Sequence, residues 1–133
     1  MKFVIISNNP LVKDTYSGKY EVSYVEGTYS DVLIATRDKC HAGHMLLSHP
    51  LSGSVKPNET LYKSIMVSKD ADVVDVDSIM LIEDAIYTAG KFGPVRRNWH
   101  EQEIKDFQLV DLTLISSAIE SAANSLGQKT RKE

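Results

Sequence analysis

Serine, histidine and lysine side chains gather in one stretch, residues 48–60, which reads Ser-His-Pro-Leu-Ser-Gly-Ser-Val-Lys-Pro-Asn-Glu-Thr. Its prolines, its glycine and its lack of apolar periodicity predict a loop. Ser52, Gly53 and Ser54 could direct hydroxyl and backbone donors at a small anion, and Lys56 would add a positive charge. Because long loops in compact domains are usually functional or disordered, this stretch predicts a site for a small anion.

His49 suggests chemistry at the same place. Histidine titrates near neutrality, so His49 could act on a small carbonyl or phosphoryl compound while the loop steadies a developing oxyanion. The alternative is a histidine that only holds the loop backbone in place. No nucleophile and base are recognisably spaced in this chain, so the sequence favours binding over catalysis.

Four further polar residues complete the candidate ligand-binding set. Glu26 is a candidate base, and Asn58 follows the second proline of the loop. Asn8 and Asn9 could donate hydrogen bonds to a ligand, or Asn8 could serve the turn that follows an apolar strand. Asparagine suits both roles, so both interpretations stay open.

The sequence predicts neither a metal site nor a cofactor. His41 and His44 lie on either side of Gly43, where a helix is expected to stop, so they do not share a helical face with each other. No cysteine or carboxylate completes a tetrahedral set with them and His49. The single cysteine, Cys40, excludes an internal disulfide and is expected to be a small buried side chain.

Composition excludes several classes of protein. The chain has 133 residues, 42% of them hydrophobic, which suits one domain with a sizeable core. A formal charge of -3 with no dominant basic face argues against nucleic-acid binding. No apolar stretch approaches the ~20 residues that span a bilayer, and the apolar run at the start is short for a signal peptide. A cytoplasmic protein without membrane association is expected.

Local patterns predict four strands and four helices. The strands are expected at residues 3–7, 20–25, 44–49 and 63–68. The first two helices are expected at residues 11–16 and 31–42, the second with Ser30 as N-cap. The third is expected to begin after a cap at Asp75 or Asp77 and to end at Gly90. The fourth is expected to begin at Asn98, which would form a capping box with Glu101, and to end at Leu126. The order predicts a single α/β domain of three layers over residues 1–127, with a polar tail at 128–133.

The element order also predicts a topology and a location for the site. Right-handed crossovers favour a mainly parallel four-stranded sheet in the order 2-1-3-4. Ligands of such sheets bind at the carboxyl ends of the strands, where the order reverses. Asn8 and Asn9 would lie there after the first strand, and His49 and the 50–60 loop after the third. Glu26 would border the same edge.

The long C-terminal helix suggests assembly. Its apolar residues, among them Leu112, Ile115 and Ile119, cover more than one stripe, so burial against one sheet would leave some in water. A homodimer formed by pairing these helices across a two-fold axis is therefore expected. The alternative is a break near Asp106 that folds two shorter helices back over the sheet.

Several stretches resemble the GrdX family, small proteins encoded with the glycine, sarcosine and betaine reductase systems of anaerobic bacteria. They are residues 7–12, 25–33 and, above all, 49–64. The resemblance implies an accessory role in amino-acid fermentation, with components of the reductase complex as partners. The reductases use selenocysteine, cysteine pairs and a pyruvoyl group, which have no counterpart in this chain.

Three hypotheses follow. The first is an accessory protein that binds a small anionic metabolite, such as a carboxylate or a phosphate, at the strand carboxyl ends. The second is a small enzyme with His49 or Glu26 as base and Lys56 as electrostatic stabiliser. The third is an interaction module that acts through its C-terminal helix.

Overall fold

The computed structural model describes residues 2–51, 60–93 and 98–132, with side chains as far as residue 124. Within these ranges three strands form one sheet in the order β2-β1-β3. They are β1 (Phe3–Ser7), β2 (Glu21–Tyr24) and β3 (Ser64–Ser68). β1 lies in the middle, parallel to β2 and antiparallel to β3.

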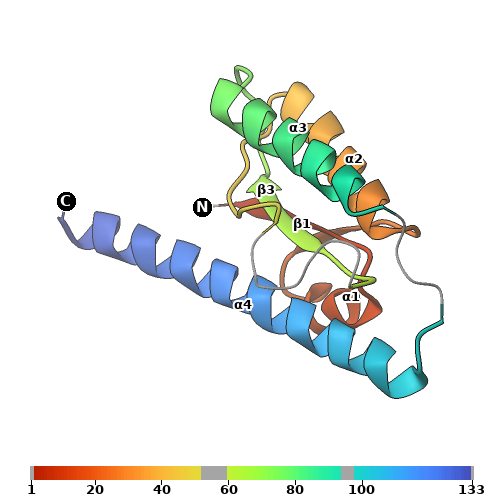
Figure 1. The fold of residues 1–133 in the computed structure, drawn as a ribbon. Helices are drawn as coiled ribbons and strands as arrows, with labels where there is room; N and C mark the ends of the chain where they lie inside the picture. The colour runs from red at the N-terminus through yellow and green to blue at the C-terminus, as the bar shows by residue number, and fades with distance from the viewer. Residues whose placement is uncertain (1, 52–59, 94–97, 133) are drawn as a thin grey trace.

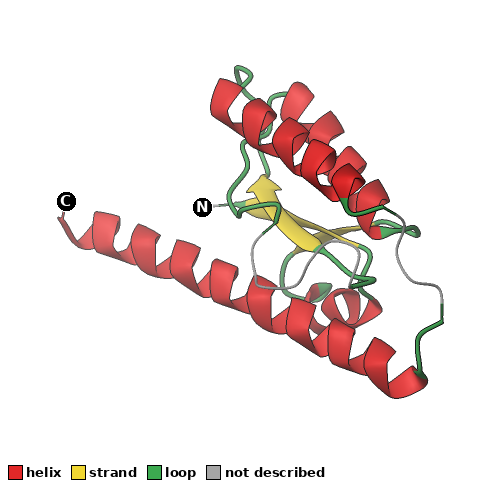
Figure 2. Cartoon of the chain, viewed as in Figure 1, coloured by secondary structure: helices red, strands yellow, loops and turns green. Residues whose placement is uncertain are grey.

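Helices cover both faces of this sheet (Figures 1 and 2). They are α1 (Pro10–Tyr16), α2 (Tyr29–His41), α3 (Val76–Lys91) and α4 (Glu101–Lys132). α2 and α3 lie side by side on one face, and α1 and the middle of α4 cover the other. The C-terminal end of α4 extends beyond the sheet (Figure 1).

The alternation of side chains along the strands divides the core in two. Val4 and Ile6 of β1 join Ile65 and Val67 of β3 in the cluster under α2 and α3. Ile5 and Met66 point the other way, against Ile115 and Ile119 of α4. Because successive side chains of a strand point to opposite faces, a continuous apolar run is buried on both sides, as expected for a central strand.

The predicted four-stranded, mainly parallel sheet in the order 2-1-3-4 is wrong. The segment expected as a third strand, residues 44–49, makes only one isolated bridge, Leu46 to Val67, on the outer side of β3. β3 occupies the place beside β1, and it runs antiparallel. For residues 63–68 to run parallel to residues 44–49, the two segments would need a crossover connection, which is usually a helix. The sequence between residues 49 and 63 predicts no helix.

Serine hydroxyls explain why residues 44–49 form no regular strand. Ser48 Oγ accepts from Met66 N at 2.9 Å, and Ser68 Oγ accepts from Met45 N at 2.8 Å. The Leu46 N–H donates at 2.9 Å to Ser78 Oγ of α3. Ser48 Oγ and Ser68 Oγ thus accept two hydrogen bonds that a regular ladder would give to carbonyls, whereas Leu47 N donates to Met66 O and Ser68 N to Met45 O, each at 2.8 Å, as in a ladder.

Helix boundaries follow the capping residues. α2 begins two residues before the expected start, because Thr28 and not Ser30 is its N-cap. Thr28 Oγ1 accepts from Asp31 N at 3.2 Å, and Thr28 N donates to Asp31 Oδ2 at 2.8 Å, which completes a capping box. Gly43 follows α2 with φ +105°, as expected for a glycine that ends a helix. Asp75 is confirmed as the N-cap of α3.

α4 is one continuous helix with no break near Asp106. Leu112 is half-buried, and Ile115 and Ile119 are 2% and 8% exposed, because all three pack on the sheet. These three side chains therefore do not lie in water, whereas Leu109 and Val110 of the same helix are 57% and 44% exposed. The homodimer stays a prediction, which sedimentation velocity at micromolar concentration would test.

Candidate functional site

A buried polar layer closes the core at the carboxyl end of β1. Ser7, Ser64 and Asp111 are each at most 5% exposed. Ser64 Oγ lies 2.7 Å from Asp111 Oδ2 and 2.7 Å from Ser7 Oγ. A hydroxyl has one hydrogen and an ionised carboxylate can only accept, so Ser64 donates to Asp111 and accepts from Ser7. This layer joins β1, β3 and α4.

Asn9 ties the same layer to α1. Its Oδ1 accepts from Leu11 N at 3.0 Å, as the N-cap of α1. Its Nδ2 donates at 2.9 Å to Gln108 O and at 3.0 Å to Asp111 Oδ2. Both hydrogens of the amide are therefore used within the protein, and Asn9 positions α4 against the strand.

Asn8 holds the chain on either side of β1. Its Nδ2 donates to Gly27 O at 3.1 Å and to Leu61 O at 2.9 Å, and its Oδ1 accepts from Lys63 N at 2.9 Å. Residues 61–63, which lead out of the predicted loop, thus lie at the end of β1. Of the two roles considered for Asn8, these hydrogen bonds favour the structural role over ligand binding, because its amide donors and its amide oxygen are already engaged within the protein.

Lys63 is a second buried charged residue beside the layer, only 4% exposed. Burial lowers its pKa to about 8, although the charge of Asp111 acts in the opposite direction. Burial raises the pKa of Asp111, against the hydrogen bonds from Ser64 and Asn9 and the charge of Lys63. Lys63 is therefore mainly protonated at pH 7, and each of the two side chains stabilises the charged form of the other.

A small cavity lies beside Lys63 and Asp111. Its volume is about 20 Å³, and it is lined by Tyr29, Thr60, Tyr62, Lys63, Val110, Asp111 and Leu114. A space of this size holds about one water molecule. Val110 is 44% exposed, so the cavity lies near the surface. Burial and the charge of Asp111 raise the pKa of Tyr29 to about 12, so its hydroxyl stays protonated.

Two of the remaining predicted site residues, Glu26 and His49, lie within the described part of the chain. Glu26 is exposed in the turn after β2. His49 is also exposed, and its Nδ1 accepts from Leu51 N at 3.0 Å, which holds the loop backbone. Ser52, Gly53, Ser54, Lys56 and Asn58 lie outside the described residues.

The histidines considered as metal ligands have separate partners. His44 Nδ1 lies 2.7 Å from Ser68 O, and His41 Nε2 lies 3.6 Å from Glu83 Oε1. Over residues 2–51, 60–93 and 98–132, no group of three or more potential metal ligands occurs.

Sequence reasoning missed Lys63 and Asp111 as site residues. One local signal was present, because Asp111 lies four residues after Phe107 and four before Ile115, within the apolar stripe of α4. A carboxylate in such a stripe is either buried with partners or marks the end of the apolar face. Lys63 gives no comparable signal, since a charged residue before a strand is ordinary.

Fold and site together define a small three-layer α/β protein with buried opposite charges at the end of its central strand. The family model described as GrdX-like protein matches residues 4–120, and the chain belongs to this family. The resemblance seen in the sequence is thereby confirmed. Comparisons with curated proteins and with solved structures gave no match. None of the helices in the described ranges is long and apolar enough to cross a membrane.

Proposed function

We propose that this protein is an accessory protein of an anaerobic glycine, sarcosine or betaine reductase system, and that it binds a small anionic metabolite at the carboxyl end of β1. Membership of the GrdX-like family supports the accessory role. The observation that carries the binding proposal is Lys63, a buried cation beside a near-surface cavity at that end of the sheet. Glycine, betaine and acetyl phosphate are suitable probes.

The cavity limits how such a ligand would bind. About 20 Å³ admits an oxygen of a carboxylate or phosphate, while the rest of the molecule would lie outside, beside Val110 and Tyr62. The anion and the Asp111 carboxylate would compete for Lys63. Binding should therefore favour protonation of Asp111, and affinity should increase as pH falls.

Thermal unfolding with each probe tests the proposal. A ligand at about 100 times its Kd should stabilise the fold by about 2.7 kcal/mol. The double variant Lys63→Met/Asp111→Leu removes both charges together, so neither is left as an unpaired buried ion, while Ser64 Oγ and Asn9 Nδ2 each lose one acceptor. It should fold and lose the stabilisation by ligand, while Lys105→Met on exposed α4 surface should retain it.

Two results would contradict binding at Lys63. The first is no stabilisation by any of the probes, and the second is equal stabilisation of the wild type and the double variant. Stabilisation lost in Lys56→Ala but kept in the double variant would move the site to the predicted loop.

The enzyme alternative is tested in the same samples. Product formation that is lost in both His49→Ala and Glu26→Gln would support it. The hydrogen bond from Leu51 N argues against His49 as base, because a neutral ring that accepts at Nδ1 carries its proton on Nε2. Such a ring has no second acceptor nitrogen for a substrate proton.

A further inference from the structure

α3 carries apolar side chains on two opposite sides. Ile82, Ala85 and Ala89 are buried against the rest of the domain. Val76, Met80 and Tyr87 are 66%, 64% and 65% exposed. Their spacing of four and seven residues puts them on one outer side of the helix. Single exposed apolar residues are ordinary, but a contiguous exposed patch usually marks an interaction surface.

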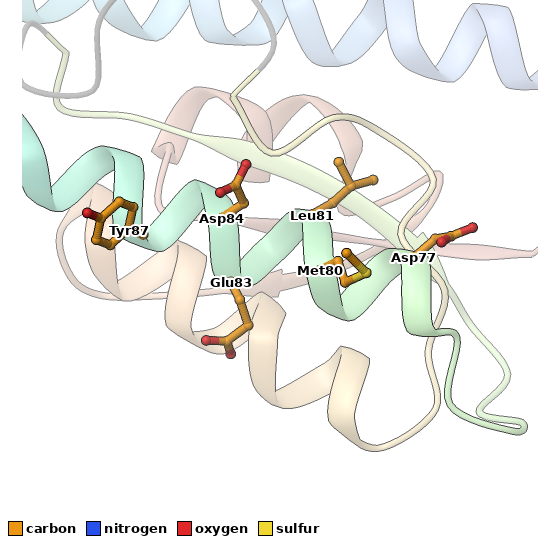
Figure 3. A pocket seen from close by; sticks show the side chains of 6 residues that line it. All are labelled: Asp77, Met80, Leu81, Glu83, Asp84 and Tyr87. Carbon is orange, nitrogen blue, oxygen red and sulfur yellow. The ribbon is translucent and has the colours of Figure 1, made fainter.

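Acidic side chains flank this outer stripe. A concavity of about 880 Å³ is lined by Asp77, Met80, Leu81, Glu83, Asp84 and Tyr87 (Figure 3). Glu83 lies 3.8 Å from Arg37 Nε and 3.6 Å from His41 Nε2, both on α2. Among the described residues neither Asp77 nor Asp84 takes part in an ion pair, so two of the three carboxylates keep their charge available.

Gly90 lies on the same outer side, three residues after Tyr87. Within the described part of the chain, a Cβ built on Gly90 meets nothing within 4 Å, and its φ is not positive. Alanine would fit there, and glycine destabilises a helix interior relative to alanine. Folding therefore gives no reason for a glycine at this position. Close approach of another backbone would give one, since a glycine leaves the helix surface bare.

We propose that the outer side of α3 docks an amphipathic helix of a partner protein. The apolar stripe of that helix would cover Met80 and Tyr87 and come close to the backbone at Gly90. Lysine or arginine side chains beside its stripe would pair with Asp77 and Asp84. This inference does not depend on the anion site, which lies at the carboxyl end of β1.

Charge decides against a second copy of this chain as the occupant. On this patch the carboxylates of Asp77, Glu83 and Asp84 outnumber Lys91, whose Nζ lies 4.4 Å from the centroid of the Tyr87 ring. A two-fold contact uses the same patch on both subunits, so an α3–α3 dimer would bring together two patches that each have a net negative charge. Like charges at close range disfavour such a pairing. A basic partner helix gains from the same charges.

Two synthetic helical peptides test the chemistry of the surface. Both carry leucine at spacings of four, three and four residues, flanked in one by lysines and in the other by glutamates. We expect calorimetric titration to detect the lysine peptide alone, with binding that weakens as salt is added. The double variant Asp77→Lys/Asp84→Lys should weaken binding about tenfold, a change equal to about 1.4 kcal/mol. Glu120→Lys, at an exposed position on α4, should leave it unchanged.

Gly90→Ala separates an effect on docking from an effect on folding, because it should stabilise the fold and weaken binding of the partner helix. It should raise the Tm of the free protein by about 2–5 °C and weaken binding of the lysine peptide. Equal binding of both peptides, binding of neither, or unchanged affinity in Gly90→Ala and in the lysine variant would overturn the proposal. Self-association that Met80→Glu abolishes would overturn it in favour of a second copy.

Discussion

On one face of the sheet, under α2 and α3, the buried side chains are apolar apart from short hydroxyls such as Thr36, which donates to Val32 O one turn earlier. On the other face, apolar packing under α4 gives way to a charged layer. Lys63 and Asp111 are the two buried side chains of the described residues that carry a formal charge. In the described part of the chain, the sheet thus has one face without a buried formal charge and one whose end carries two.

This difference suggests different tasks for the two faces. Apolar contacts stabilise a helix on a sheet but tolerate small shifts, whereas hydrogen bonds to a buried carboxylate require one position. Asp111 accepts from Ser64 of β3 and from Asn9 at the start of α1. We infer that it sets the register of α4, at an energetic cost that the α2–α3 face does not carry.

Of the substitutions that test the difference between the two faces, Asp111→Ala should lower the free energy of unfolding most. It removes the acceptor of Ser64 and Asn9 and leaves Lys63 as an uncompensated buried cation. We expect the free energy of unfolding, measured by urea titration at pH 7, to fall by about 3–5 kcal/mol. Glu120→Ala, an exposed acid on the same helix, should change it by less than about 0.5 kcal/mol. A loss below about 1 kcal/mol for Asp111→Ala would show that the layer does not hold α4.

Lys63→Met should change how stability depends on pH. The folded-state pKa of Lys63, about 8, lies below the ordinary lysine value of 10.5, so the unfolded state binds more protons between these pH values. Wild-type stability should therefore rise with pH across this window relative to Lys63→Met, by about 3 kcal/mol in total. Urea titrations of both proteins at intervals from pH 7 to 10.5 measure this difference. A constant difference across the window would contradict the lowered pKa.

Matched isoleucine substitutions on the two faces should change the free energy of unfolding least. They test whether apolar packing contributes equally to stability on both faces. Ile82→Val on α3 and Ile115→Val on α4 each remove one buried methylene, so each should cost about 0.5–1.5 kcal/mol. Similar losses in thermal or urea unfolding would confine the difference between the faces to the charged layer. A loss for Ile115→Val that greatly exceeds the other would show that the apolar packing differs as well.

Local rules predicted much of the fold from the sequence. β1 matches the expected apolar run, Gly43 ends α2, and Asp75 caps α3. The sheet order could not be predicted in this way. It depends on pairing between distant segments: β3 pairs directly with β1 in the antiparallel sense, and residues 44–48 lie on the outer side of β3, where Ser48 Oγ accepts from Met66 N.

The site was predictable only in part, for a similar reason. Asn8 and Asn9 were found because they follow an apolar strand, and the structure places both at its end. Lys63 and Asp111 become neighbours only when α4 folds back onto the sheet. No spacing rule within a short window joins a residue before β3 to one in the middle of a C-terminal helix.

The hydrogen bonds to serine hydroxyls along residues 44–48 also affect whether a strand of another molecule can add to this edge of the sheet. An exposed strand edge is a template for pairing between chains, and this one has its Leu46 N–H occupied by Ser78 Oγ of α3. The opposite edge, β2, is four residues long and carries the Glu21–Lys69 ion pair at 3.5 Å. Short, charged edges resist strand addition, so amyloid-like polymerisation of this protein would have to begin with local unfolding.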